Sequence, residues 1–255
     1  MTDLWGLADY PALARRLAPA ADALVDAVRP LDGRRVLDVA AGTGNVAVPA
    51  AAAGADVVAC DSSPGMVRLG RERTGDAVRW YEADAEDLPV SDGSVDVVLS
   101  AFGLIFAPRP EVAVAQARRV LVPAGTLALT AWTADGFMAT MTRVMVDFLP
   151  ANDDAPDGPP APDPVGWGLE REARTRLGAG FDDVRIQPRT LPWRFDSGAA
   201  MTAFMRAHSP MHAAAAYAVG DRADQMFAAV EKLAAPHGGP VLIDAEYLLI
   251  TARAS

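Results

Sequence analysis

The sequence predicts a single α/β domain built on a doubly wound sheet of seven strands, with a helical cap. In the first half of the chain, short apolar runs that end at turn residues alternate with stretches of helical periodicity. This alternation is typical of parallel strands that are joined by helices. The length of 255 residues fits one domain of ordinary size with room for an inserted cap.

Each element of the first half begins and ends at a recognisable residue. The five expected strands span residues 35–40, 56–60, 78–83, 95–100 and 126–131. The expected helices span 43–53, 64–73 and 110–121. Pro49 lies inside the first helix, so we expect an irregular first turn there. Ser63 is expected to cap the second helix, with Pro64 at its first position.

The second half predicts a cap that interrupts the sheet. A helix carries apolar residues from Phe137 to Phe148, and the Pro/Asp-rich segment 150–164 reads as a loop. Helices behind Ser197 and Asp221 separate two further strands, at 181–187 and 241–251. We therefore expect a core of residues 31–133, 181–191 and 240–255, and a cap formed by 1–30, 134–180 and 192–239.

Composition limits the partners of the chain. The net charge is −10 with a single lysine, and arginine pairs such as Arg118–Arg119 read as solvated surface, so we expect no nucleic-acid partner. Apolar runs stay well short of the roughly 20 residues of a membrane span, so no membrane association is expected. Cys60 is the only cysteine, which excludes an internal disulfide, and we expect no metal site and a cytoplasmic location.

A glycine-containing turn follows the first strand and indicates a ligand site. It reads Asp38-Val39-Ala40-Ala41-Gly42-Thr43-Gly44. Glycines let the backbone approach a ligand closely, and the carboxyl ends of parallel strands are where α/β folds bind ligands. A carboxylate at Asp38 suits a ligand that carries an ammonium group rather than a pyrophosphate.

Two more acids occur at the ends of the next strands. Asp61 follows the second strand, where it can accept both hydroxyls of a ribose, and Asp84 follows the third, beside backbone groups that suit an adenine edge. Three acids at three successive strand ends match the amino-acid, ribose and base parts of S-adenosylmethionine.

These segments resemble the class I methyltransferases, in particular the group of ubiquinone and menaquinone biosynthesis enzymes. The matching segments are VLDVAAGTGNVA (36–47), VVACDSSPGMV (57–67), ADAEDLPVSDGSVDVVLS (83–100) and RRVLVPAGTLALTAWT (118–133). The resemblance implies a Rossmann-like sheet with an antiparallel C-terminal strand, S-adenosylmethionine as cofactor and S-adenosylhomocysteine as product. It also implies these cofactor-binding residues: Asp38, Ala40, Gly42 and Gly44 at the methionine part, Asp61 and Ser62 at the ribose, Met66, Asp84 and Ala85 at the adenine, and Ser100, Ala101 and Phe102 at the sulfonium. Ala40 and Ala124 stand where the family usually has glycine.

Two alternatives stay open at this point. Gly42-x-Gly44-x-x-Ala47 also fits a nicotinamide-dinucleotide fingerprint, which would make the chain an NAD(P)-dependent oxidoreductase. Against this, Asp38 would place a negative charge near a pyrophosphate, and the only lysine, Lys232, has no tyrosine four residues before it. The other alternative is a catalytically inactive cofactor-binding protein.

The methyl acceptor is expected to be a small organic molecule. Methyl transfer from a sulfonium is an in-line displacement, so the protein mainly has to align the acceptor and exclude water. If a base is needed, His208 and His212 in the cap are the candidates. We expect the cap, with the N-terminal helix around Trp5 and Tyr10, to enclose an apolar or aromatic acceptor that contacts Phe102 or Phe204.

Overall fold

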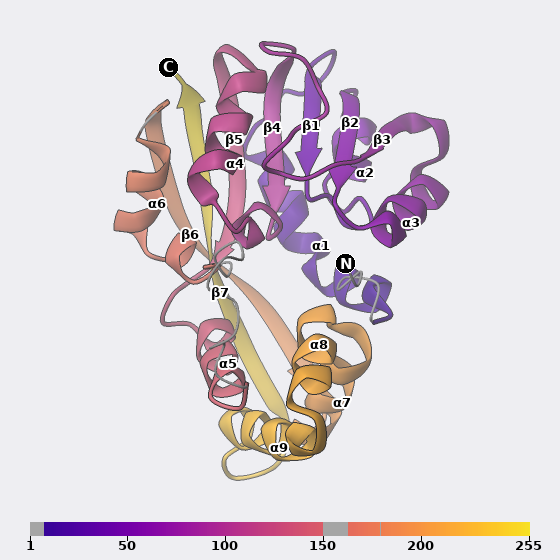
Figure 1. Cartoon of the computed structure of the whole chain (residues 1–255), viewed down its shortest axis with the longest axis vertical. Helices are drawn as coiled ribbons and strands as arrows, with labels where there is room; N and C mark the ends of the chain where they lie inside the picture. Colours follow the sequence, from indigo (N-terminus) through magenta and orange to yellow (C-terminus); the bar gives the residue numbers. More distant parts are fainter. Residues whose placement is uncertain (1–7, 150–162, 179) are drawn as a thin grey trace.

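The computed structural model describes residues 8–149, 163–178 and 180–255. A seven-stranded sheet in the order β3-β2-β1-β4-β5-β7-β6 forms its centre (Figure 1). The strands are β1 (Arg35–Val39), β2 (Asp56–Asp61), β3 (Val78–Glu82), β4 (Val95–Ala101), β5 (Leu121–Trp132), β6 (Phe181–Phe195) and β7 (Val241–Ala254). The pairs among β1 to β5 are parallel, and β7 is antiparallel to both β5 and β6. The predicted fold class is therefore confirmed.

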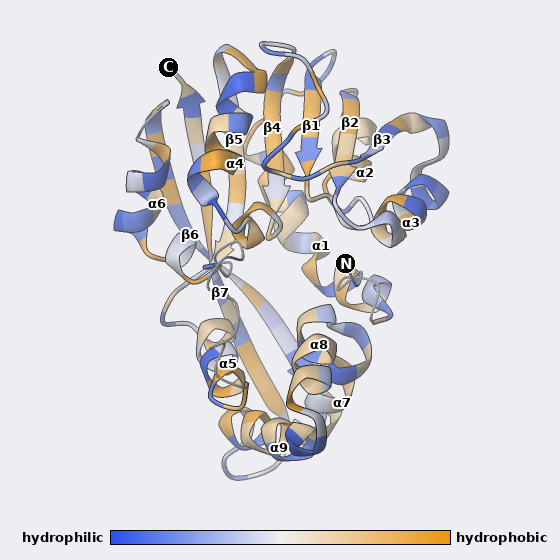
Figure 2. Cartoon of the chain, viewed as in Figure 1, coloured by the Kyte–Doolittle hydropathy of each residue, from blue (hydrophilic) through white to orange (hydrophobic). Residues whose placement is uncertain are grey.

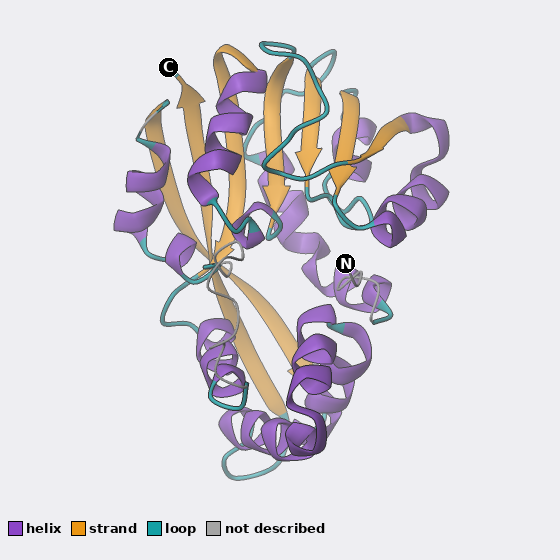
Figure 3. Cartoon of the chain, viewed as in Figure 1, coloured by secondary structure: helices purple, strands orange, loops and turns teal. Residues whose placement is uncertain are grey.

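Helices cover both faces of the sheet and build a separate lobe below it (Figure 3). They are α1 (Tyr10–Asp26), α2 (Ala47–Ala52), α3 (Pro64–Thr74), α4 (Pro110–Val120), α5 (Phe137–Val146), α6 (Glu170–Leu177), α7 (Gly198–His208), α8 (Pro210–Val219) and α9 (Ala223–Ala234). Figure 1 shows α4 in front of the sheet and α1 behind it, while α5, α7, α8 and α9 form the lobe, which we call the cap. None of the helices in the described ranges combines the length and the hydropathy that a membrane span requires.

The centre of the sheet is apolar because its strands are buried on both faces (Figure 2). Leu37 of β1, Leu99 of β4 and Leu129 of β5 are fully buried. The first turn of α3 follows the prediction, since the Ser63 hydroxyl accepts the N–H of Met66 at 3.2 Å. Side-chain caps of this kind stabilise a helix start by about 1 kcal/mol.

The structure differs clearly from the sequence prediction in the length of four elements, of which β5 begins at Leu121 instead of Thr126. Helix α2 begins at Ala47 instead of Thr43, because residues 42–46 form turns that bring the backbone back toward β1. Pro49 then lies in the first helical turn, where a missing N–H costs little. Strands β6 and β7 are much longer than predicted, because they continue beyond the sheet as a two-stranded ribbon.

This ribbon carries the cap. Figure 1 shows β6 and β7 passing between α5 on one side and α7 and α8 on the other. The carboxyl ends of the parallel strands face the cap, and the strand order reverses between β1 and β4. Helix α1, expected with the cap, packs along the sheet and reaches α7 with its first part. The site predicted at the strand ends therefore opens toward the cap.

Candidate functional site

The side chain of Asp38, near the end of β1, holds the turn that follows this strand. Asp38 is 1% exposed, and its Oδ2 accepts the N–H of Ala47 at 3.0 Å. Its Oδ1 has no hydrogen-bond partner within the described part of the chain. Burial raises the pKa of the Asp38 carboxyl well above its usual range, and the nearby Asp61 raises it further, although the Ala47 N–H opposes this. A cation at Oδ1 would remove this penalty.

Asp61 fixes the same turn from the neighbouring strand. Its Oδ2 accepts the N–H of Gly42 at 2.8 Å, and its Oδ1 accepts the N–H of Ser63 at 2.9 Å. Ala40, Gly42 and Gly44 have positive φ angles of 52°, 56° and 86°. The turn thus takes a left-handed course that glycine adopts without strain.

The three predicted acids lie around one strand end. Burial raises the pKa of the Cys60 thiol to about 12, and the carboxylates of Asp38, Asp61 and Asp84 all add to this rise. Asp84 differs from the other two, because it is exposed and its Oδ1 accepts the N–H of Glu86 at 2.9 Å. Cys60 itself is buried and protonated, which is typical of a packing residue.

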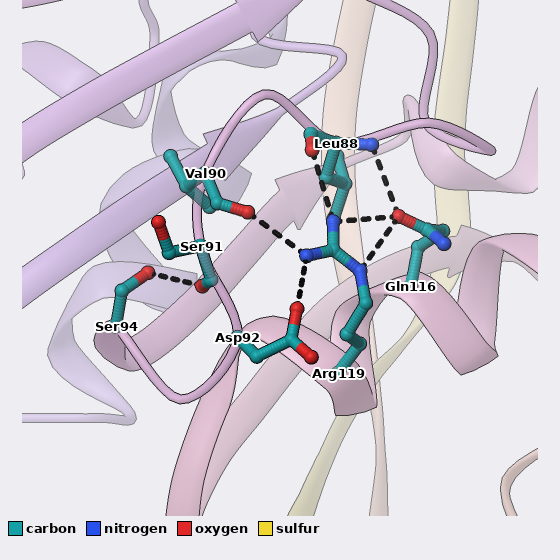
Figure 4. A network of polar contacts seen from close by, with 7 residues as sticks. All are labelled: Leu88, Val90, Ser91, Asp92, Ser94, Gln116 and Arg119. Atoms are coloured by element: carbon teal, nitrogen blue, oxygen red, sulfur yellow. Dashed lines mark hydrogen bonds and ion pairs between the residues drawn. The ribbon is translucent and has the colours of Figure 1, made fainter.

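The loop after β3, which carries Asp84 and Ala85, is tied to α4 (Figure 4). Arg119 donates to the carbonyl oxygens of Leu88 and Val90, each at 2.9 Å, and to Asp92 Oδ1 at 2.7 Å. Gln116 Oε1 accepts from Arg119 and from the N–H of Leu88. The prediction that Arg119 is solvated surface was wrong: its side chain is 29% exposed and holds this loop.

Two other predicted residues flank the acids on the α3 side. Met66 is 3% exposed in the first turn of α3, whereas Ser62 is exposed. Neither lines the two cavities described below.

The turn after β4 closes the opposite side. Ser100 is fully buried, and its hydroxyl donates to the Val39 carbonyl and accepts the N–H of Leu104, both at 2.8 Å. Ser100 therefore ties β4 to β1. Phe102 has a positive φ of 55° and donates its N–H to Thr130 Oγ1 at 3.0 Å. This strained backbone directs the Phe102 ring onto Trp132, with centroids 4.0 Å apart.

A narrow cleft of about 20 Å³ lies over the glycine turn. It is lined by Tyr10, Leu17, Asp38, Ala40, Ala41, Thr43, Asn45, Val46 and Ala101. The Tyr10 ring lies 3.2 Å from where a Cβ on Gly42 would be, so it packs directly on the turn. Burial, with the Asp61 and Asp38 carboxylates, raises the pKa of the Tyr10 phenol, which stays protonated. The sequence placed Tyr10 near the acceptor but did not indicate this contact.

An apolar cavity of about 140 Å³ adjoins this cleft and shares Tyr10 and Leu17 with it. Its other lining residues come from α1, the sheet edge, the segment before α6, and the cap: Leu13, Phe102, Phe106, Trp132, Met138, Ala139, Met141, Thr142, Met145, Pro164, Val165, Trp193, Met205, Ser209, Pro210, Met211 and His212. Phe102 is thus in the cavity wall as expected, whereas Phe204 is not. Trp5 and residues 150–162 lie outside the described residues.

The two candidate histidines have different surroundings. His208, at the end of α7, contacts Asp9 and does not line the cavity. His212, in the first turn of α8, lines the cavity and is 5% exposed. Its Nδ1 lies 2.8 Å from Ser209 Oγ. Burial lowers the pKa of His212 to about 4, so the imidazole is neutral near pH 7.

Comparison with known proteins agrees with this arrangement. Residues 37–129 match a family model described as a methyltransferase domain. An uncharacterized protein of Mycobacterium tuberculosis is 34% identical over 98% of this chain and 92% of its own length. A demethylmenaquinone methyltransferase of Renibacterium salmoninarum is 42% identical over 50% of this chain and 55% of its own length.

Solved structures show the same fold at low identity. The YcgJ protein from Bacillus subtilis has a TM-score of 0.62 at 17% identity and covers 92% of this chain and 97% of its own. A SAM-dependent methyltransferase from Thermotoga maritima has a TM-score of 0.56 at 18% identity, and the match covers 96% of this chain and 92% of that protein. The alternatives of a nicotinamide oxidoreductase and of an inactive binding protein gain no support from these matches. Residues 37–129 therefore belong to the methyltransferase-domain family, and these matches indicate S-adenosylmethionine as the cofactor.

Proposed function

We propose that the chain methylates a small apolar or aromatic acceptor by in-line displacement, with the acceptor held in the cavity beneath the cap. The observation that carries the proposal is the wall of Tyr10 and Leu17, which the glycine-turn cleft and the apolar cavity share. A donor in the cleft and an acceptor in the cavity would therefore be neighbours. Holding two reactants side by side can supply a large part of the rate enhancement.

The residues around the cleft fit S-adenosylmethionine. The unpartnered, buried Oδ1 of Asp38 suits the ammonium group of the cofactor, since a buried carboxylate needs a partner. Asp61 would hold the ribose with Ser62 beside it, and Met66, Asp84 and Ala85 would hold the adenine. Ala40, Gly42 and Gly44 would border the methionine part, and Ala101 and Phe102 the sulfonium, while Ser100 keeps their turn in place.

When bound, the cofactor supplies a methyl group that is already activated by its sulfonium. The remaining task of the chain is to exclude water and to orient the acceptor. The cavity wall is suited to both, because it is mainly apolar and contains the stacked rings of Phe102 and Trp132. Met138, Met141 and Met145 of α5 add flexible side chains that adapt to ligand shape.

The direct test is an acceptor screen by mass spectrometry. Purified protein would be incubated with S-adenosylmethionine bearing a trideuterated methyl group and with matched sets of apolar and charged small molecules. We expect the trideuteromethyl group on apolar or aromatic acceptors, and much less transfer by the Asp38→Asn variant at a cofactor concentration that does not saturate it. Transfer confined to the charged acceptors would overturn the proposal.

A further inference from the structure

Unsatisfied polar atoms are concentrated at the two cavities. Within the described ranges, four buried side-chain nitrogen or oxygen atoms have no hydrogen-bond partner: Asp38 Oδ1, Trp167 Nε1, Trp193 Nε1 and His212 Nε2. Asp38 borders the glycine-turn cleft, and Trp193 and His212 line the apolar cavity. Because buried polar atoms are nearly always paired, this concentration indicates partners that a ligand supplies.

Trp193 restricts the chemistry of one partner. The indole N–H only donates, so the atom that meets it must be an acceptor such as a carbonyl or hydroxyl oxygen. Trp193 lies on the β6 part of the ribbon, and its side chain is 2% exposed. Its ring contacts Trp132 edge-on, with centroids 6.4 Å apart, which fixes it in the wall.

His212 provides the second polar position. The Ser209 hydroxyl engages Nδ1, and the ring stacks on Phe227 with centroids 6.4 Å apart, so the imidazole is held on two sides. The Nε2 atom can donate or accept, according to the tautomer that Ser209 selects. A neutral imidazole also avoids repulsion with a sulfonium in the adjoining cleft, which a lysine or arginine would cause.

We propose that the acceptor is an apolar molecule carrying oxygen substituents, and that Trp193 Nε1 and His212 Nε2 hydrogen-bond these oxygens and so select it. The inference rests on the proposed function, because it takes the apolar cavity as the acceptor site. These two hydrogen bonds would favour oxygenated apolar molecules, such as phenols and ketones, over hydrocarbons of the same shape. Trp193 and His212 are then specificity-determining residues of the acceptor site.

The test compares naphthalene with 2-naphthol, which differ by one hydroxyl group. Their dissociation constants would be measured by equilibrium dialysis in the presence of S-adenosylhomocysteine, for wild type and for the variants His212→Phe, Trp193→Phe and the double variant. Both ligands are measured on each variant, so a change in packing largely cancels in the ratio of the two constants. Trp167→Phe is the matched control, since it removes an unpartnered indole N–H that lies outside the cavity.

We expect the preference for 2-naphthol over naphthalene to fall by roughly tenfold from wild type to the double variant, and to stay unchanged in Trp167→Phe. If His212→Phe does not fold, His212→Leu combined with Trp193→Phe gives the same comparison. An unchanged preference in the double variant would overturn this inference and leave the acceptor cavity standing. Failure of the wild type to bind either ligand would overturn both the inference and the cavity as acceptor site.

Discussion

The Asp61 carboxylate accepts the N–H of Gly42 at 2.8 Å, so the acid that ends β2 holds the glycine turn that follows β1. The other oxygen of the same carboxylate accepts the N–H of Ser63 at 2.9 Å. Asp61 thus fixes the turns that follow β1 and β2, in addition to the ribose contact that we propose for it. The shape of the glycine-turn cleft depends on this contact between Asp61 and Gly42.

Replacing Gly42 by alanine should disturb the glycine turn and its contact with Tyr10. The new Cβ would lie 3.2 Å from the Tyr10 ring, and the residue would keep a φ of +56° that alanine disfavours. We expect a loss of roughly 1–2 kcal/mol in the free energy of unfolding from the backbone alone. We also expect weaker binding of S-adenosylhomocysteine by calorimetry, because Tyr10 must shift.

Gly93→Ala is the matched control for this substitution. Gly93 has a φ of +57°, but nothing lies within 4 Å of the position of its Cβ. It should show a similar loss of stability with unchanged cofactor affinity. Equal cofactor affinity in Gly42→Ala and wild type would show that the contact with Tyr10 does not shape the cleft.

Ala124→Gly should stabilise the protein. Ala124 is exposed and has a φ of 59°, so the substitution relieves strain without loss of buried surface. Glycine makes the unfolded chain more flexible, which offsets part of this relief. We therefore expect the free energy of unfolding, measured with urea, to rise by about 0.5–1 kcal/mol. Ala27→Gly, at an exposed position with a φ of −65°, should instead destabilise the protein. A destabilised Ala124→Gly would contradict this account of the turn.

Arg119→Met should loosen the loop that carries Asp84 and Ala85. The variant loses the hydrogen bonds to Leu88, Val90, Asp92 and Gln116, and we expect it to be less stable by about 1–3 kcal/mol. Its affinity for S-adenosylhomocysteine should also fall. Urea unfolding and calorimetry would measure the two effects.

Arg68→Met is the control for this loss of charge. Arg68 pairs with Glu72 on α3, and the two side chains are 65% and 60% exposed, so its removal should cost no more than about 0.5 kcal/mol. If Arg119→Met were as stable as Arg68→Met, the loop would not depend on the network in Figure 4.

A comparison of Phe102→Leu with Phe204→Leu should show whether the acceptor binds in the cavity or elsewhere in the cap. Phe102 lines the cavity, whereas Phe204 packs on Phe195 and His208 outside it. We expect a raised KM for the acceptor in Phe102→Leu, and an unchanged KM with retained cofactor affinity in Phe204→Leu. Steady-state kinetics with an acceptor found by the mass-spectrometric screen would measure this. The reverse order of effects would place the acceptor elsewhere.

Much of the fold is predictable from the sequence because local signals and tertiary structure agree. The apolar runs of β1 and β4 end at turns, and Ser63 followed by Pro64 starts α3 where a cap predicts it. Ala40 and Ala124 stand where the resemblance to the methyltransferases leads us to expect glycine, and both have a left-handed backbone. At these two positions the resemblance therefore predicts the backbone conformation, although the residue is alanine.

Features that depend on distant partners could not be predicted. The β6–β7 ribbon continues beyond the sheet because each strand pairs with the other, which no local pattern reveals. Arg119 reads as a surface residue until α4 is placed against the loop after β3. Pro210 indicates from the sequence that His208 and His212 need not share a helical face. Which of the two lines the cavity depends on how the cap packs, and the sequence does not show this.

Asp38 is the residue that we propose to hold the amino-acid part of the cofactor. Asp38→Asn keeps an oxygen that can accept the N–H of Ala47, but removes the charge that the ammonium group needs. The pKa of Asp38 is raised in the free protein, so ammonium binding should release a proton, and wild-type affinity should weaken as the pH falls through that pKa. Asp38→Asn should lack this part of the pH dependence.

The most direct measurement is calorimetry of S-adenosylhomocysteine and of 5′-methylthioadenosine, which lacks the amino-acid part, on wild type and on Asp38→Asn. We predict that the variant binds S-adenosylhomocysteine roughly 10- to 100-fold more weakly and 5′-methylthioadenosine as tightly as wild type. Unchanged affinity of Asp38→Asn for S-adenosylhomocysteine would contradict the claim.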